Sequence, residues 1–197
     1  MKPLIIIGGG GHAKSVIDVI ESSRNWNIEG LIGQPQEIGK TVLGYKIIGT
    51  DADLKKIRSR VPYAILAIGQ ILSPNRRIQL AKVLKRLGFE SPTVASVSST
   101  VSKHAQIGEG TTIGHGAIVN AGAKIGEHCI INSGALIEHD ACIGNYCHIS
   151  TGALINGMVN IGDESFIGSG ATIRNNLALP SGTIISAGKR VMGWPLL

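Results

Sequence analysis

The sequence is poor in aromatic residues, in cysteine and in long apolar runs. Only 4% of its 197 residues are Phe, Trp or Tyr, and its three cysteines, Cys129, Cys142 and Cys147, lack the CxxC spacing of zinc and redox motifs. We therefore expect free core thiols and no metal site. No run reaches the length of a membrane-spanning helix, and MKPLIII is too short for the apolar region of a signal peptide, so we expect a cytoplasmic protein without membrane insertion.

Charge is also sparse, at 16% of residues, with a moderate net charge of +6. A solvated basic surface is the commonest cause of such an excess, followed by a basic patch that receives a polyanionic small molecule. Nucleic-acid binding is disfavoured, because the lysines and arginines are scattered and no aromatic-basic motif accompanies them. What the sequence has in abundance is glycine, with 27 residues, and aliphatic side chains.

A six-residue period runs through the second half of the chain. Every sixth residue from Val101 to Ile185 is Val, Ile or Leu, which makes fifteen hexads without an insertion. The residue directly after each aliphatic one is usually Gly or Asn, and the fourth is mostly small. This pattern predicts a parallel β-helix of about five coils, in which aliphatic and small residues fill the core. We expect Gly or Asn to supply the left-handed backbone of the corners.

Residues 1–92 follow a different pattern. Short strands at PLIII, NIEGLIG and YAILAIG alternate with helical segments that begin near Gly11 and Asn75. The alternation predicts a small Rossmann-like parallel sheet with helices. We therefore expect two domains, an α/β domain over residues 1–92 and a β-helix with a C-terminal tail over residues 93–197.

The glycine run Gly8-Gly9-Gly10-Gly11-His12 follows the first strand and opens the first helix, which is the context of a phosphate-binding loop. A dinucleotide fold carries an acidic residue after its second strand, whereas this chain has LIGQ there. We therefore exclude NAD and expect a nucleotide diphosphate. Gly69 and Gln70 end the next strand and are expected to line the same crevice. A tight turn without a ligand is the alternative.

One β-helix corner carries three ionisable residues in a row, Glu138, His139 and Asp140. Consecutive corner side chains cannot all point inward, so they lie mostly outside the prism, and Glu138 should carry a conformational cost where Gly or Asn is usual. One coil away from His139 are Ala121 and Gly157, which leave space beside the ring. Asp140 can orient the imidazole as a general base requires. The alternative is an exposed loop histidine.

A second histidine, His148, lies on another side of the predicted prism. It is too far from His139 to share a site within one subunit, although the two can meet across a subunit interface. A metal site built on both would lack a third ligand.

Together these residues resemble a known family. The segments IIIGGGGHAKSVID, AIG and IEHDACIGNYCHIS, with the hexads, are similar to the left-handed β-helix (hexapeptide-repeat) acetyltransferases that act on nucleotide sugars in bacterial glycan synthesis. Examples are the UDP-4-amino-sugar (bacillosamine-type) and GDP-perosamine N-acetyltransferases and the sialic acid O-acetyltransferase-like proteins. The resemblance covers nearly the whole chain.

The resemblance implies transfer of acetyl from acetyl-CoA to the amino group of a nucleotide-linked sugar of the 4-amino-4,6-dideoxy type, in a homotrimer with active sites at subunit interfaces. It implies His139 as catalytic base and Asp140 as the acid that raises its basicity. The C-terminal MGWPLL departs from the family, so Lys189 is expected to replace a lysine that contacts CoA phosphates. The other implied contacts are His148, Gly157 and Ser169 for acetyl-CoA, and Asn132 and the glycine loop for the sugar nucleotide.

Two alternatives remain open on the sequence. The same residues would serve O-acetylation of a sugar such as sialic acid, and the second alternative is a non-catalytic β-helix scaffold or sugar-nucleotide sensor. A nucleotidyltransferase is disfavoured, because the N-terminal domain is short and its glycine loop lacks the following Arg and Lys of that class.

Overall fold

The computed structural model describes residues 1–195 and divides the chain into two compact units. The first comprises residues 1–69 and 75–92, and the second comprises residues 70–74 and the chain from Thr93 on. The segment Gln70–Pro74, which we expected in the first domain, therefore belongs to the second. No helix within the described residues is long and apolar enough to span a membrane.

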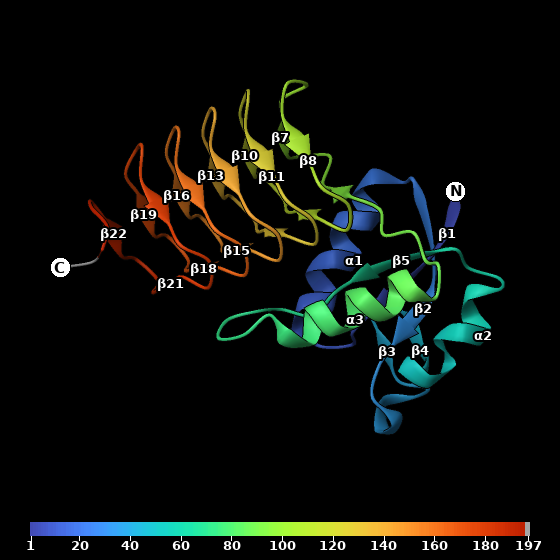
Figure 1. Ribbon diagram of the computed structural model, residues 1–197. Helices are drawn as coiled ribbons and strands as arrows, with labels where there is room; N and C mark the ends of the chain where they lie inside the picture. Colours follow the sequence, from blue (N-terminus) through green and yellow to red (C-terminus); the bar gives the residue numbers. More distant parts are fainter. Residues whose placement is uncertain (196–197) are drawn as a thin grey trace. The chain divides into compact units, whose positions relative to one another are not determined.

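A five-stranded sheet forms the centre of the first unit, in the order β3-β4-β2-β1-β5 (Figure 1). All neighbouring pairs are parallel except β3 with β4, which form an antiparallel edge. The sequence predicts β1, β2 and β5 but not β3 and β4, which are short and half exposed. The strands are β1 (Lys2–Ile7), β2 (Trp26–Ile32), β3 (Thr41–Val42), β4 (Tyr45–Gly49) and β5 (Tyr63–Leu66).

Helices connect these strands, as a parallel sheet requires. Helix α1 (Gly11–Ser23) begins directly after the glycine run and buries its apolar side, which includes Val16, Ile17 and Ile20. Helix α3 ends before Gly88, whose positive φ of 80° suits a helix terminus. The remaining helices are α2 (Leu54–Arg58), α3 (Asn75–Arg86) and the 3-10 turns η1 (Pro35–Glu37) and η2 (Asp51–Asp53).

The second unit is a left-handed parallel β-helix whose strands are two residues long and lie in three sheets of six, five and six strands. We name each sheet by its first strand. The β6 face comprises β6 (Val94–Ala95), β9 (Thr112–Ile113), β12 (Ile130–Ile131), β15 (His148–Ile149), β18 (Phe166–Ile167) and β21 (Ile184–Ile185). The β7 face comprises β7 (Thr100–Val101), β10 (Ile118–Val119), β13 (Leu136–Ile137), β16 (Leu154–Ile155), β19 (Thr172–Ile173) and β22 (Arg190–Val191). The β8 face comprises β8 (Gln106–Ile107), β11 (Lys124–Ile125), β14 (Cys142–Ile143), β17 (Asn160–Ile161) and β20 (Ala178–Leu179).

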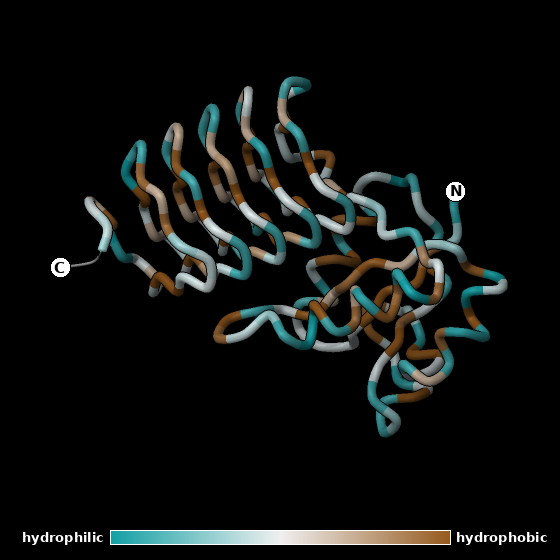
Figure 2. The backbone as a smooth tube through the Cα atoms, in the orientation of Figure 1, coloured by the Kyte–Doolittle hydropathy of each residue, from teal (hydrophilic) through white to brown (hydrophobic). Residues whose placement is uncertain are grey.

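The six-residue period sets the register of the coils. Ile137 pairs with Ile155 in the next coil, eighteen residues further on, and the same spacing holds in all three sheets. The aliphatic position of the hexad and the small position four residues later are buried together, as Ile137 and Ala141 show. The hydropathy colouring accordingly repeats from coil to coil (Figure 2).

The three cysteines are free, and two of them occupy the small core position. Cys129 and Cys147 are buried, and their thiols donate to the carbonyl oxygens of Gly144 and Gly162. Two effects raise the pKa of the Cys147 thiol: the larger is its side-chain hydrogen bond with Cys129, and the second is its burial. These thiols are therefore packing groups of the core.

The glycines directly after the aliphatic residues do not supply the left-handed backbone of the corners, contrary to our expectation. From Ile107 to Ile185, positive φ values occur at the third residue after the aliphatic position, for example 67° at Gly110 and 59° at Asp140, and not at the first. The first position holds glycine for another reason, close approach of the next coil: a Cβ at Gly108 would lie 2.5 Å from the carbonyl carbon of Gly126. Coil stacking therefore explains these glycines better than backbone handedness.

Candidate functional site

His139 and Asp140 lie in the turn that joins β13 to β14, at the corner between the β7 and β8 faces. The Nδ1 atom of His139 lies 2.9 Å from Oδ2 of Asp140, and the two side chains are 58% and 63% exposed. Because a carboxylate can only accept, this contact places the proton on Nδ1 and leaves the lone pair of Nε2 available. The pair is therefore arranged as a general base and its orienting acid.

Glycines one coil above and one coil below make room for this pair. A Cβ at Gly157 would lie 2.7 Å from Nε2 of His139, and a Cβ at Gly122 would overlap Oδ1 of Asp140. The space predicted beside His139 exists, but the imidazole edge itself occupies part of it. Asp140 holds a left-handed backbone, which Asp tolerates better than most residues. Both side chains therefore depend on glycine in the neighbouring coils.

Glu138 supports the same turn from within the corner. Its Oε2 atom accepts a hydrogen bond from Nδ2 of Asn120, one coil below, and a longer one from the backbone N–H of His139. The equivalent positions in the other coils of this corner are Ser102, Asn120, Asn156 and Arg174, so no glycine is displaced here. The expected conformational cost at Glu138 is therefore wrong, because positive φ falls on Asp140.

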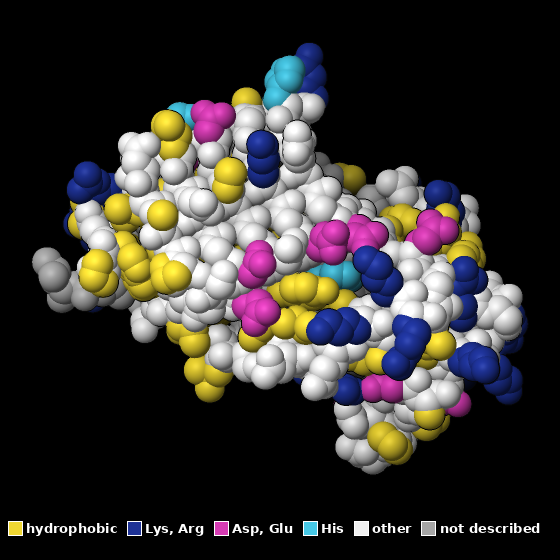
Figure 3. Space-filling model, in the orientation of Figure 1, with side chains coloured by type: hydrophobic (Ala, Val, Ile, Leu, Met, Phe, Trp, Pro, Cys, Tyr) yellow, Lys and Arg dark blue, Asp and Glu magenta, His cyan; other side chains and the backbone are white. Residues whose placement is uncertain are grey.

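The β7 face lies between this corner and the corner that carries Ser169 and Lys189. Ser169 is exposed, and its hydroxyl lies 2.9 Å from that of Ser150. Lys189 is also exposed, beside β22 at the C-terminal end of the face, where dark blue cationic side chains are visible in Figure 3. The structure thus places Gly157, Ser169 and Lys189 along the two borders of one face.

Apolar side chains cover the middle of the same face. Ile118 and Leu154 are exposed on it, Leu136 is half buried between them, and Met158 is exposed at the His139 corner. The basic residues follow beyond this stripe, in the last coils. The β7 face therefore combines an apolar stripe with a cationic end, next to a candidate base. Its cationic residues are Arg174, Lys189 and Arg190.

His148 lies elsewhere, buried on the β6 face. Its Nδ1 donates to the carbonyl oxygen of Gln70 at 2.6 Å, within the second unit, and Asn132 approaches its Nε2 at 3.4 Å. His148, Asn132 and Gln70 are therefore brought to one another and not to His139. Phe166 packs edge-on against the imidazole.

A cavity of about 330 Å³ lies over the carboxyl ends of the parallel strands in the first unit. The predicted residues Gly8, Gly10, Gly11, His12 and Gly69 line it, which places the glycine run and the end of β5 in one pocket. Gln70 is not among its lining residues. The glycine backbone is open here, since a Cβ at Gly10 or Gly11 would meet nothing within 4 Å.

Three charged residues, Glu37, Asp51 and Arg76, also line this pocket. Asp51 and Arg76 form an ion pair on its wall. Glu37 reaches the pocket from η1, because its Oε2 accepts a hydrogen bond from the backbone N–H of Gln34 at 2.7 Å. Glu37 therefore supplies a carboxylate near the end of β2 that the sequence alone did not indicate.

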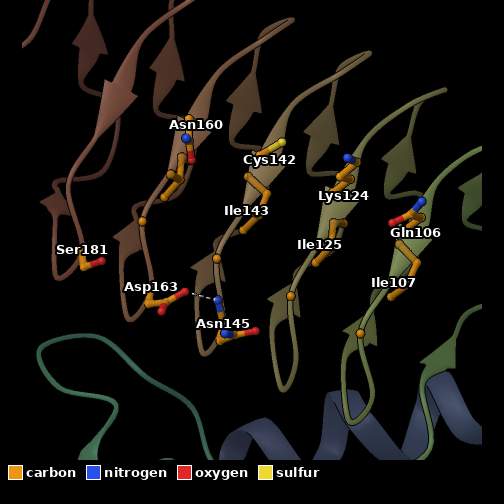
Figure 4. Close-up of a pocket in the computed structure, with 15 residues that line it drawn as sticks. Gln106, Ile107, Lys124, Ile125, Cys142, Ile143, Asn145, Asn160, Asp163 and Ser181 are labelled. Atoms are coloured by element: carbon orange, nitrogen blue, oxygen red, sulfur yellow. Dashed lines mark hydrogen bonds between the residues drawn. The ribbon is translucent and has the colours of Figure 1, made fainter.

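A second hollow of about 580 Å³ runs along the β8 face (Figure 4). Polar side chains from successive strands line it, including Gln106, Lys124 and Asn160. At its edge the backbone N–H of Asn145 donates to Oδ1 of Asp163 at 2.7 Å. Among the described residues, no three His, Cys, Asp or Glu side chains gather in the way that a metal ion requires.

Two family models match the sequence. The PglD N-terminal domain matches residues 3–84, and the bacterial transferase hexapeptide (six repeats) matches residues 104–139 and 122–157. Among curated proteins, no sequence matches this chain.

Several solved structures are similar over nearly the whole chain. A perosamine N-acetyltransferase variant from Caulobacter crescentus, in complex with CoA and GDP-perosamine, is 30% identical, covers 98% of this chain and 89% of its own, and has a TM-score of 0.91. The acetyltransferase domain of PglB from Neisseria gonorrhoeae is 30% identical, with coverages of 98% and 92% and a TM-score of 0.88. That domain in complex with acetyl coenzyme A is 29% identical, with coverages of 96% and 92% and a TM-score of 0.87.

Proposed function

This chain belongs to the hexapeptide-repeat acetyltransferases with a PglD-type N-terminal domain, and on that basis we propose that it transfers acetyl from acetyl-CoA to the amino group of a nucleotide-linked amino sugar. Similar enzymes hold the two substrates concerned, since one was solved with CoA and GDP-perosamine and another with acetyl coenzyme A. The observation that carries the proposal is the His139–Asp140 pair, whose Nε2 faces Gly157 at an exposed corner.

The chemistry assigned to His139 is removal of one proton. The neutral amine attacks the thioester carbonyl carbon, a C–N bond forms, and the C–S bond breaks. Nε2 of His139 accepts the amine proton and returns it to the departing CoA sulfur, so the products are the N-acetyl sugar and the CoA thiol. Asp140 accepts from Nδ1–H throughout and stabilises the imidazolium that forms.

We assign the β7 face to acetyl-CoA. Its apolar stripe offers a surface for the pantetheine chain, and Arg174, Lys189 and Arg190 offer positive charge for the phosphates. Gly157 and Ser169 border the path, in line with the contacts that the family resemblance implies. His148 lies on the β6 face, where it holds the carbonyl of Gln70, so the proposed contact of His148 with acetyl-CoA would come from a neighbouring subunit of the trimer.

The proposal includes a homotrimer in which a second β-helix covers the β7 face and encloses the CoA. Exposed Ile118 and Leu154 would otherwise leave an apolar stripe in water, next to the candidate base. The three free cysteines fit a reducing compartment, and we propose the cytoplasm. The cavity of the first unit would hold the nucleotide, with the glycine run at its diphosphate.

The direct test is the rate of CoA release with a panel of UDP-, GDP- and dTDP-linked 4-amino sugars. His139→Ala should lower kcat by about 10²- to 10⁴-fold on the accepted substrate, the usual loss on removing a general base. His104→Ala is the matched control, because His104 is an exposed histidine at the same corner of the prism. Near-normal turnover by the His139 variant would rule out the proposed base, and acetylation of hydroxyl acceptors only would indicate O-acetyl transfer.

A further inference from the structure

The carboxylate of Glu37 stands where a nucleotide-binding sheet usually presents its ribose contact. In such sheets an acidic side chain follows the second strand and accepts hydrogen bonds from the ribose. Here β2 ends at Ile32, and the next residues, Gly33 and Gln34, carry no charge. The chain then turns through Pro35–Glu37 and brings the fourth residue after Gly33 back to the strand end.

The carboxylate of Glu37 lies close to the ends of both β1 and β2. A Cβ at Gly33 would lie 2.9 Å from Oε2 of Glu37, and a Cβ at Gly9 would lie 3.8 Å from the same atom. The carboxylate therefore lies against the residue after β2 and against the glycine run after β1. Glycine at position 33 is what leaves space for it, so Glu37 takes the position that a side chain at residue 33 would otherwise fill.

The turn holds the carboxylate in one orientation. Oε2 of Glu37 accepts from the backbone N–H of Gln34 at 2.7 Å, and the backbone N–H of Glu37 donates to the carbonyl oxygen of Gln34 at 2.9 Å. Pro35 at the start of the turn restricts the backbone further. Within residues 1–195, Glu37 forms no ion pair, whereas Asp51, the other carboxylate of the pocket, is paired with Arg76. Glu37 is therefore a carboxylate of the pocket wall with no cationic partner, which suits it to accept a hydrogen bond from a ligand.

We infer that Glu37 accepts a hydrogen bond from the 2′-hydroxyl of the bound nucleotide and makes the enzyme selective for ribonucleotide sugars over 2′-deoxyribonucleotide sugars. The inference rests on the proposed function, in which this cavity holds the nucleotide. A site built to bond a hydroxyl discriminates against the analogue that lacks it, because its own polar group is then left without a partner. UDP- and GDP-linked sugars fit this requirement, and dTDP-linked sugars do not.

The test compares matched nucleotides that differ only in this hydroxyl. UDP is titrated against 2′-deoxy-UDP, and GDP against 2′-deoxy-GDP, into the full-length protein by calorimetry. We expect the ribonucleotide of the accepted base to bind about ten- to a hundredfold more tightly, the range for a hydrogen bond to a charged group. Equal affinities for the two forms would overturn the inference while leaving the nucleotide site intact.

Two variants assign the effect to the side chain. Glu37→Gln keeps an acceptor for the Gln34 N–H and should reduce the ribose preference several-fold, and Glu37→Ala should reduce it to near unity. Glu29→Gln removes one negative charge from an exposed position of β2 outside the pocket and should leave the preference unchanged. A purely structural role for Glu37 would weaken both nucleotide forms alike, and an unchanged ratio in Glu37→Ala would overturn the inference. If no nucleotide binds at all, the site assignment and the inference fail together.

Discussion

At the scale of single residues, His139 depends on the absence of a side chain one coil away. The edge of its ring lies against Gly157, so packing from the next coil and the hydrogen bond with Asp140 together set the orientation of Nε2. A catalytic geometry of this kind tolerates little displacement, because about 1 Å of misplacement can cost a hundredfold in rate.

Gly157→Ala should therefore reduce kcat by about ten- to a hundredfold while the fold is retained. The added Cβ would meet the end of a movable side chain, which can rotate out of its position. The measurement is CoA release, with thermal unfolding as the measure of the fold. Gly144→Ala is the contrasting variant: its Cβ would lie 2.6 Å from the backbone nitrogen of Asp163, which cannot move aside, so it should destabilise the protein by about 1–3 kcal/mol. Full activity in Gly157→Ala would contradict this account.

The sequence reveals His139 and Asp140 because they interrupt a regular background, but it does not reveal Glu37. The first two are visible as charge at a corner of a repeat whose geometry is known once the period is recognised. Glu37 reaches its pocket through the one-turn 3-10 helix Pro35–Glu37, and so short a turn leaves no periodic pattern of apolar residues in the sequence. Gln70 was misplaced for a related reason, since its loop leaves the first unit and packs on His148.

At the scale of elements, the hexads specify their own structure because each position recurs in the same environment. The inward aliphatic and small residues were predicted correctly for this reason. The role of the corner glycines was not, because two constraints, left-handed φ and close coil approach, both select glycine at different positions of the turn. Strands β3 and β4 were missed because they are short and half exposed.

The 3-10 turn η2, directly before α2, gives a pH-dependent prediction for the first unit. Hydrogen bonds from Thr50, first from its backbone N–H and then from its hydroxyl, lower the pKa of Asp53, and Lys56 adds to this. A lowered carboxyl pKa means that the stabilisation is complete above the ordinary value of 3.8 and is lost as pH falls through the lower, folded-state value.

Asp53→Asn should therefore be less stable than the parent at pH 7, and the difference should shrink as the medium is acidified below pH 4. Urea unfolding followed by helical circular dichroism reports on the first unit, because the helices of the described residues lie there. Glu29→Gln controls for the loss of one negative charge. A stability difference that stays constant across this pH range would contradict the proposed capping role.

At the scale of the whole molecule, the exposed stripe on the β7 face predicts association. Leu136→Glu would place a charge in the middle of this stripe, and a charge buried in an interface without a partner is strongly unfavourable. We expect the variant to shift from trimer to monomer in light scattering and to lose acetyl-CoA binding. Ile184→Glu, which changes an exposed aliphatic residue on the β6 face, is the control. A trimer that survives Leu136→Glu would place the interface elsewhere.

The vertical pairing of coils has a further consequence for how such a protein can change its length. Each coil contains eighteen residues, so the position of every side chain relative to the neighbouring coils depends on this number being kept. Loss of a single residue between Asp140 and Gly157 would keep the His139–Asp140 pair yet put Met158 above the imidazole in place of Gly157. Insertions and deletions therefore preserve the stacking of the side chains only if they add or remove a whole eighteen-residue coil, or if the extra residues form a loop that protrudes at a corner.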